Sequence, residues 1–164
     1  MKPDNFSYIG GCIQMSKSGY PIWWDTTVTI YNKFVDTNTQ VITWYRTVVT
    51  DCFWNLDGTK VSIGDVVLDS KSVLCRIPKD DTFLERKDWV TLAADEKKNY
   101  FTLGQGDIIV RGSVEDTINE YQAGHRSTDL LSKYREAQWC MEITDYSNNT
   151  GVGRNNEHYL VRGK

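Results

Sequence analysis

Two segments rich in β-branched and aromatic residues constrain the fold of this chain most strongly. They lie at residues 27–31 and 41–49, and a polar, turn-rich stretch at residues 35–40 joins them. Such side chains favour the pleated, half-buried surface of a sheet. The two segments therefore predict a pair of neighbouring strands in a mainly β protein.

Strand signals recur along most of the remaining chain. Asp57 and Gly58 form a dipeptide that favours a tight hairpin turn, so we expect the chain to reverse there into a strand at 61–68. The next strand, at 72–77, should end at Pro78, because proline has no N–H to donate to a neighbouring strand. Further strands are expected at 100–103, 108–114, 139–144 and 158–162.

One helix is expected at about residues 127–138. Leu130, Leu131 and Tyr134 recur at helical spacing, and Ser127 or Thr128 can cap the first turn. Strands do not alternate with helices along the chain, so a parallel sheet is not indicated. The predicted fold class is mainly β: an antiparallel β-barrel or sandwich with one α-helix and a long inserted loop.

The chain is expected to form an N-terminal arm, residues 1–25, and a single β-rich domain, residues 26–164. A length of 164 residues suits one domain. The arm ends in an aromatic cluster at residues 20–24, which should pack against the domain. Residues 79–100 break the strand rhythm with charges of alternating sign, which indicates a surface excursion with one or two helical turns at 92–100.

Charge and hydropathy argue against nucleic-acid binding and membrane insertion as main tasks. The net charge is -3, so no basic field attracts phosphates. No apolar run approaches the ~20 residues of a membrane-spanning helix, and the first residues have no apolar core of a signal peptide. We expect a protein of the cytosol, or one assembled there, with no membrane partner.

The cysteines are expected to be buried free thiols and not metal ligands. They lie far apart, at positions 12, 52, 75 and 140, with no C-x-x-C pair and only two histidines in the chain. The last three sit in apolar, strand-like contexts, where a reduced thiol acts as a small hydrophobic group. No metal and no cofactor is predicted.

No motif in the sequence indicates catalysis. The Gly-x-Gly pairs at 104–106 and 151–153 do not open a helix as a phosphate loop does, and hairpin turns explain them. Residues 124–129 bring His, Ser and Asp together, but triad residues meet in the fold and not in the sequence. We expect no enzyme, and interpret this cluster as a helix start with His125 and Arg126 available to another subunit.

The aromatic residues divide into a core set and a contact set. Trp44, Trp54 and Trp139 lie in strand patterns and are expected in the core. Residues in irregular segments are the candidates for an interface, because aromatic residues and Arg are enriched there. The candidate interface residues are Trp23, Trp24, Phe83, Arg86, Trp89, Tyr121, His125, Arg126 and Arg154.

Several strings of residues from about position 26 to the end resemble a known group of proteins. They are 28–33 (VTIYNK), 43–47 (TWYRT), 52–54 (CFW), 76–78 (RIP), 100–103 (YFTL), 106–112 (GDIIVRG), 124–131 (GHRSTDLL) and 153–163 (GRNNEHYLVRG). The chain resembles small head-tail connector proteins of tailed phages and prophages of Gram-positive, mainly Firmicute, bacteria. These are often labelled minor capsid or head-tail proteins.

The resemblance implies a structural protein of the virion neck, assembled in the host cytoplasm. Such a protein would form a sixfold or twelvefold ring of its own copies between a portal-side adaptor and the tail terminator or other tail proteins. Genomic DNA would pass through the ring without sequence-specific binding. A small β-barrel with few helices fits the stopper, or head-completion protein, best.

Two alternatives remain open from the sequence. A tail terminator or minor tail protein would occupy a neighbouring place in the same particle. A monomeric β-sandwich module that binds carbohydrate or peptide through exposed Trp and Tyr belongs to a different class, and would show a ligand-dependent tryptophan signal.

Overall fold

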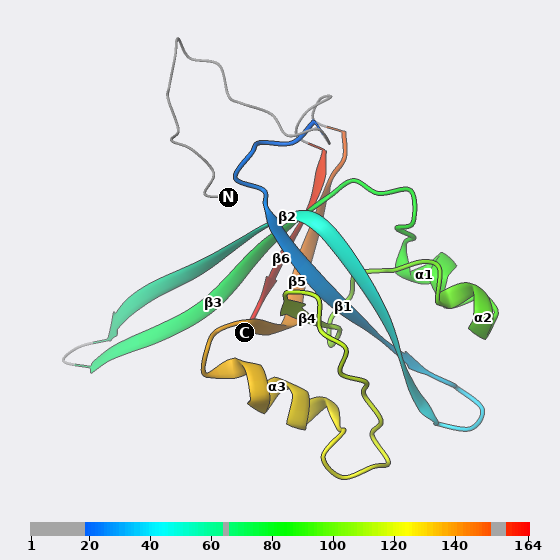
Figure 1. The fold of residues 1–164 in the computed structure, drawn as a ribbon. Helices are drawn as coiled ribbons and strands as arrows, with labels where there is room; N and C mark the ends of the chain where they lie inside the picture. Colours follow the sequence, from blue (N-terminus) through cyan, green and yellow to red (C-terminus); the bar gives the residue numbers. More distant parts are fainter. Residues whose placement is uncertain (1–18, 64–65, 152–156) are drawn as a thin grey trace.

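Six antiparallel strands close into a barrel in this computed structural model, which describes residues 19–63, 66–151 and 157–164 and, over 57–71, the backbone alone. The order of strands around the barrel is β1-β2-β3-β6-β5-β4, and β4 pairs with β1 to close it (Figure 1). The expected mainly β, antiparallel fold is confirmed. The strands are β1 (Thr26–Val35), β2 (Ile42–Ile63), β3 (Val66–Pro78), β4 (Ile108–Arg111), β5 (Cys140–Asn149) and β6 (His158–Gly163).

Apolar side chains from every strand and from residues 101–103 fill the barrel. Cys52 and Cys75 are among these buried residues, and a hydrogen bond between the two thiols together with burial raises the pKa of Cys52. Cys140 is also buried and free, so the expectation of buried thiols is confirmed for these three, whereas Cys12 lies outside the described residues. The barrel cluster comprises Val28, Ile30, Val49, Cys52, Val73, Cys75, Ile77, Phe101, Leu103, Ile109, Met141, Ile143, Tyr159 and Val161.

A second apolar cluster lies outside the barrel, under helix α3 (Ser127–Arg135). Leu130 and Leu131 of the helix pack there with Ile108 and Val110 of β4. Strand β4 is therefore covered on both faces, which explains its continuous apolar sequence, since a strand with one wet face would alternate. Ser127 or Thr128 was expected to be the N-cap, but the N-cap is Arg126, so the helix begins at Ser127. The backbone N–H of Arg126 donates to Asp129 Oδ2.

Strands β2 and β3 continue beyond the barrel as a two-stranded ribbon. Asp57 and Gly58 lie within β2, so the hairpin turn predicted there is wrong. The chain reverses between Ile63 and Val66, which pair directly, and the two residues between them lie outside the described residues. The longer register gains cross-strand pairs such as Val61 with Leu68, which a turn at 57–58 would lose.

Two further sequence expectations fail for identifiable reasons. Residues 100–103 form no strand, because the Asn32 side chain bonds both the N–H and the carbonyl of Thr102 in place of a strand neighbour. Trp139 is 49% exposed and is not a core residue, since the chain turns at Gln138 with a positive φ of 55° before β5 begins. Trp44 and Trp54 are half-buried and pack against the two clusters, as expected of core residues.

The surface excursion at 79–100 carries two short helices, α1 (Arg86–Trp89) and α2 (Ala94–Lys97). The second lies where helical turns were expected, whereas the first was not predicted from sequence. Figure 1 shows both helices at one side of the barrel, away from the β2–β3 ribbon. Within the described ranges, none of the helices has the length and apolar character that a bilayer-spanning helix requires.

The aromatic end of the N-terminal arm packs against the domain, as expected. Trp24 is only 5% exposed and stacks on Tyr20, with the ring centroids 5.1 Å apart. The ring of His158 meets it edge-on at 5.6 Å, and Phe53 of β2 lies at 6.4 Å. The earlier residues of the arm, 1–18, lie outside the described residues.

A test of the barrel's close packing is Gly163→Ala. A Cβ at this buried position of β6 would overlap the carbonyl oxygen of Glu142 and lie 2.9 Å from Met141 Cβ, so β5 or β6 must shift. We expect the free energy of unfolding to fall by roughly 1–3 kcal/mol, measured by urea denaturation followed by circular dichroism.

The matched control is Gly151→Ala, because a Cβ there has no neighbour within 4 Å. It should change the free energy of unfolding by less than about 0.5 kcal/mol. Equal stabilities for the two variants would contradict the packing described at Gly163.

Candidate contact surface

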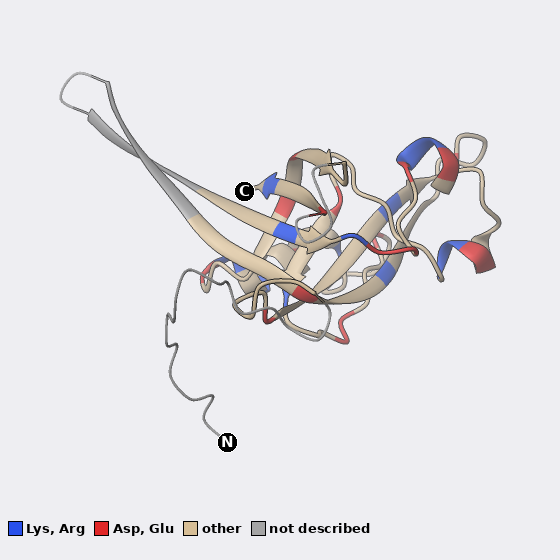
Figure 2. Cartoon of the chain, turned by 90° about the horizontal axis from the view of Figure 1, so that it is seen from above, with Lys and Arg blue, Asp and Glu red and all other residues tan. Residues whose placement is uncertain are grey.

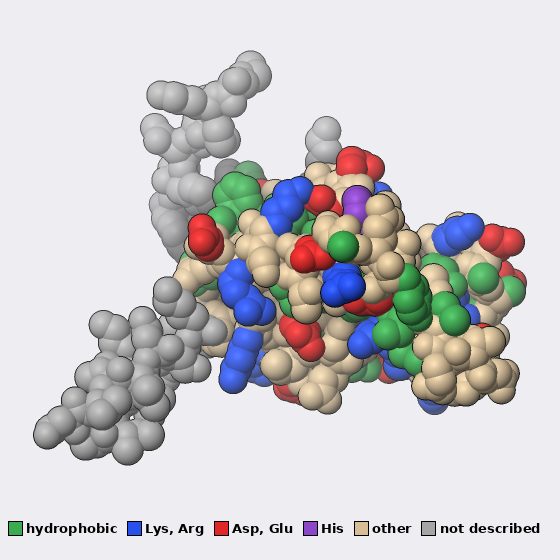
Figure 3. All heavy atoms as spheres, turned by 90° about the horizontal axis from the view of Figure 1, so that it is seen from below, with side chains coloured by type: hydrophobic (Ala, Val, Ile, Leu, Met, Phe, Trp, Pro, Cys, Tyr) green, Lys and Arg blue, Asp and Glu red, His purple; other side chains and the backbone are tan. Residues whose placement is uncertain are grey.

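A hollow of about 550 Å³ lies where the turn after β1 meets helix α1, and we call it the tip hollow. Val35 of β1 and Val90 after α1 contribute apolar side chains to it, and they are 41% and 39% exposed. Hydrophobic side chains gather on this side of the molecule in Figure 3. The lining residues are Phe34, Val35, Asp36, Thr37, Asn38, Arg86 and Val90.

The β1–β2 turn, residues 36–41, has a defined backbone that shapes one wall of the tip hollow. The Asp36 carboxylate accepts hydrogen bonds from the N–H groups of Asn38 and Thr39, at 2.8 and 3.1 Å. The bonds from Thr39 and Asn38 lower the pKa of Asp36. Gln40 takes a positive φ of 57° to bring the chain back into β2.

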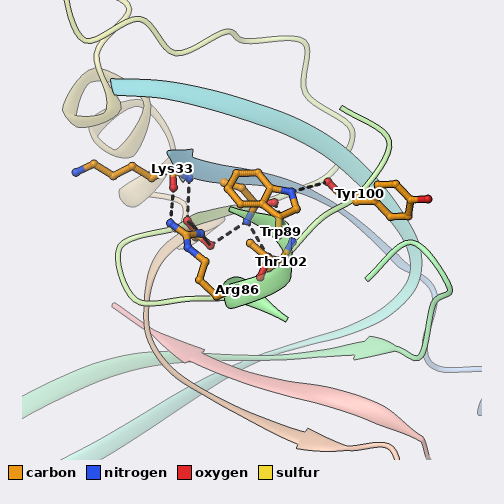
Figure 4. A network of polar contacts seen from close by, with 7 residues as sticks. Lys33, Arg86, Trp89, Tyr100 and Thr102 are labelled. Carbon is orange, nitrogen blue, oxygen red and sulfur yellow. Dashed lines mark hydrogen bonds and ion pairs between the residues drawn. The ribbon is translucent and has the colours of Figure 1, made fainter. Parts of the chain in front are cut away.

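The buried carboxylate of Asp107 holds in place the other wall of the tip hollow, at helix α1. Asp107, with no exposed surface, accepts two hydrogen bonds from Arg86 Nη1, at 3.1 and 3.0 Å. It also accepts from the backbone N–H of Lys33 at 2.8 Å and from Asn32 Nδ2 at 2.9 Å. The second guanidinium nitrogen of Arg86 donates to the carbonyl of Lys33. This network ties α1 to the end of β1 (Figure 4).

Burial raises the pKa of Asp107 to about 6, although Arg86 and the hydrogen bonds act in the opposite direction. The folded protein therefore holds this proton more tightly than the unfolded chain does. The contribution of Asp107 to the free energy of unfolding is greatest below pH 4 and declines as the pH rises through about 6. The Arg86 partner limits that decline.

Trp89 is the apolar anchor of the α1–α2 lobe, by which we mean residues 79–100. Its side chain has no exposed surface, and its Nε1–H donates to the carbonyl of Tyr100 at 3.2 Å (Figure 4). The rings of Phe34 and Tyr45 meet it edge-on, at 6.2 and 5.5 Å. The Lys97 ammonium lies 4.4 Å from the Phe34 ring centroid, and burial lowers the pKa of Lys97.

These contacts correct the expected roles of several candidate interface residues. Trp89 and Trp24 are buried, so neither can contact a partner in this conformation. Arg86 is engaged by Asp107 and Lys33, but its side chain is 35% exposed and lines the tip hollow, so an interface role for it stays a prediction. Phe83 is half-buried and packs on Tyr159 of the barrel cluster, with centroids 4.0 Å apart. All four hold the fold together.

Other candidates remain on the surface but do not form one site. Trp23 is 37% exposed at the end of the N-terminal arm, whereas Tyr121 is 65% exposed in the loop before α3. His125 and Arg126 are exposed beside the start of that helix. Arg154 lies outside the described residues. The structure therefore separates these residues into different regions of the surface.

Tyr121 belongs to a strap, residues 113–126, that crosses the outer side of β1 and β2. The beginning of the strap is fixed to α3, because the Asp116 carboxylate accepts hydrogen bonds from Lys133 at 2.7 Å and from Tyr134 at 2.6 Å. The bond from Lys133 lowers the pKa of Asp116. The strap is also hydrogen-bonded to β1 and β2, through Tyr31 Oη to Asp116 O, Val114 N to Thr29 Oγ1, Arg46 Nε to Val114 O, Arg46 Nη2 to Glu115 Oε1, Trp44 Nε1 to Glu120 Oε1 and Ile42 N to Tyr121 Oη.

The charged groups of the described surface are dispersed. Among residues 19–63, 66–151 and 157–164, no cluster of three or more His, Cys, Asp or Glu side chains could hold a metal ion. Acidic and basic residues are interspersed over the barrel and the lobe in Figure 2, with no extended patch of one sign in that view. The tip hollow is lined by one acid, one base and apolar or neutral groups.

Apart from Arg86, sequence reasoning missed the residues that shape the tip hollow. Val35 and Val90 are ordinary apolar residues in sequence, and only the fold leaves them exposed together. Asp107 had a weak signal, since it directly precedes the wholly apolar stretch Ile108, Ile109 and Val110. A carboxylate at the start of a strand buried on both faces is expected to need a partner.

Comparison with known proteins gives a family without a known activity. Residues 23–164 match the family of unknown function DUF6751, and the chain belongs to that family. The match includes Trp24 and spans the whole barrel. No curated protein and no solved structure matches the chain.

The Arg86–Asp107 pair can be tested with Arg86→Met, which keeps much of the side-chain volume and removes the charge. We expect a loss of about 2–3 kcal/mol in the free energy of unfolding at pH 8, because Asp107 is left buried without its cation. This value is reduced from that of a fully buried pair because the Arg86 side chain is 35% exposed. The loss should be smaller at pH 5, where Asp107 is mostly neutral.

Lys87→Met is the matched control, since Lys87 is an exposed neighbour on α1. Its effect should be small at both pH values. In an Asp107→Asn background, the effect of Arg86→Met should lose its pH dependence. A pH-dependent loss that persists in that background would assign the effect to another group.

The anchoring role of Trp89 can be separated from a contact role by comparison with Trp139. Trp89→Ala should cost roughly 3–5 kcal/mol, because it leaves a cavity beneath the lobe. Trp139→Ala should cost less than about 1 kcal/mol, since this side chain is half-exposed. Urea denaturation followed by circular dichroism measures both, and similar losses would contradict the difference in burial.

Proposed function

We propose that this chain is a structural protein of the neck of a tailed bacteriophage. In this proposal its copies form a ring that joins the DNA-filled head to the tail and helps to retain or conduct the genome. The ring lies in the virion and is assembled in the host cytoplasm. Its neighbours are a portal-side adaptor and tail proteins, and its function requires no catalytic residue.

The observation that carries this proposal is the shape of the subunit. A closed barrel bears the β2–β3 ribbon on one side and the α1–α2 lobe with the β1–β2 turn on the other (Figure 1). A ring requires two different surfaces on each subunit, because heterologous contacts close into a ring when the rotation between copies allows it. The resemblance of the sequence strings to head-tail connectors points in the same direction.

Within the neck, the fold favours a stopper over a tail terminator. The helices of the described residues are short, and the longest is α3. A stopper is typically a small β-barrel with few helices, whereas a tail terminator usually combines a sheet with substantial helices. The net charge of -3 gives little attraction for the DNA that would pass through the ring.

A complementation experiment tests the proposal. In a phage that encodes this chain, deletion of the gene should leave DNA-packed heads and full-length tails as separate particles in the lysate. Adding the purified protein to this lysate should restore plaque-forming particles, because the missing joint is supplied. Electron microscopy of the lysate and a plaque count measure the two effects.

The alternatives give different outcomes. Loss of a tail terminator would produce tails of irregular length, and loss of a minor tail protein would leave heads joined to incomplete tails. Normal joined particles in the deletion lysate would contradict any role in the neck. The folded variant Gly151→Ala should restore joining as well as the wild type does, and buffer alone should not.

A further inference from the structure

The β2–β3 ribbon has no third strand to support it. Strand β1 pairs with β2 only as far as Cys52, and β6 pairs with β3 only from Val73 onward, within the described part of the chain. Leu56, which pairs with Val73, therefore marks the barrel wall. At about 3.3 Å per residue, the stretch from Leu56 to Ile63 reaches about 23 Å beyond this wall.

The outer end of the ribbon is apolar in sequence, whereas its inner part, residues 57–60 and 69–72, is polar. Five of the six residues at 61–63 and 66–68 are apolar, namely Val61, Ile63, Val66, Val67 and Leu68. A two-stranded hairpin by itself is marginally stable in water and gains stability by packing on another element. Leu56, at the root of the ribbon, is 49% exposed. The ribbon is therefore expected to be covered by something outside its own barrel.

The tip hollow is an apolar surface of the kind that could accept it. Val35, Val90 and the neighbouring Val41 are 41%, 39% and 45% exposed, and the half-buried Phe34 lies at the hollow's wall. Its walls are held by the Arg86–Asp107 network and by the Asp36 turn, so the surface is formed before a partner arrives. Preformed surfaces lose less entropy on binding.

The ribbon and the tip hollow lie on opposite sides of the barrel. Figure 1 shows the ribbon leaving on one side and the β1–β2 turn and α1 on the other. A ribbon cannot reach the hollow of its own chain from there. The ribbon of one copy can instead reach the tip hollow of a second copy.

We propose that the β2–β3 ribbon of one copy seats in the tip hollow of the next copy. The contact is heterologous, since each copy gives its ribbon to one neighbour and its hollow to the other. Repetition of the contact builds the ring of the proposed function, on which this inference rests. Apolar burial and not charge drives it, because the hollow has one acid and one base in its lining.

Two variants, each lacking one surface, test the contact. In the first, a two-residue Asn-Gly turn replaces residues 57–72 and connects Leu56 to Val73. These two residues already pair across the ribbon. In the second, Val90→Glu places a charge in the hollow at a side chain that is already 39% exposed. Circular dichroism and thermal unfolding check that both variants are folded.

Light scattering after size exclusion measures their assembly. The wild type should form oligomers, and each variant alone should be monomeric. Mixed together, the two variants should form a one-to-one heterodimer and nothing larger, because the first keeps only an intact hollow and the second only an intact ribbon. Val48→Glu, a matched change at a 37% exposed valine of β2, should assemble as the wild type does.

Several results would overturn the proposal. They are a wild type that stays monomeric, a variant that assembles normally, a variant that dimerises alone because ribbons pair with ribbons or hollows with hollows, or a mixture that remains monomeric. If the shortened variant does not fold, the double variant Val61→Lys with Leu68→Glu replaces it. Its opposite charges face each other in the register, so the ribbon stays paired while its apolar character is lost.

The complementation assay separates this inference from the proposed function. A shortened variant that joins heads to tails as well as the wild type would overturn the ribbon contact and leave the neck function standing. If the wild type does not restore joining, but the two variants still pair one-to-one, the neck function fails and the contact between copies stands.

Discussion

The buried carboxylate of Asp107 is the constraint on which the outer surface of this protein depends. It lies just before β4, yet its partners come from β1 and α1. A carboxylate inside a protein must be neutral or be fully paired. Arg86 supplies the opposite charge. Movement of the α1–α2 lobe away from the barrel would therefore leave the Asp107 carboxylate without its cation. One residue therefore fixes the position of a lobe that has little helix of its own.

Local signals predicted the elements whose residues interact mainly with their neighbours in sequence or across one turn. The strands at 27–31 and 41–49 and the helix near 127 follow from β-branched density and from helical spacing, and the structure contains all three. The turn at Asp57 and Gly58 failed because the register of a long ribbon outweighed a two-residue preference. Residues 100–103 failed because a side chain, Asn32, occupied the backbone groups that a strand would use.

The candidate site was much less predictable than the fold. Exposure is a tertiary property, so the local sequence around a tryptophan can indicate the opposite of its actual burial. Trp89 in an irregular segment is fully buried, whereas Trp139 in a strand-like context is half-exposed. The valines of the tip hollow had no sequence signal, because they differ from core valines only in that no other element covers them. The family, whose activity is unknown, adds no residue roles.

The 22-residue strand β2 also has a mechanical meaning. Its first half is bonded to β1 inside the barrel wall, and its second half forms one edge of the ribbon. A pull along the ribbon therefore loads the β1–β2 and β3–β6 ladders in shear, with many hydrogen bonds stretched together and not opened one after another. In the proposed ring, a subunit built in this way would carry tension between neighbours through its wall, and the apolar barrel interior would be spared the load.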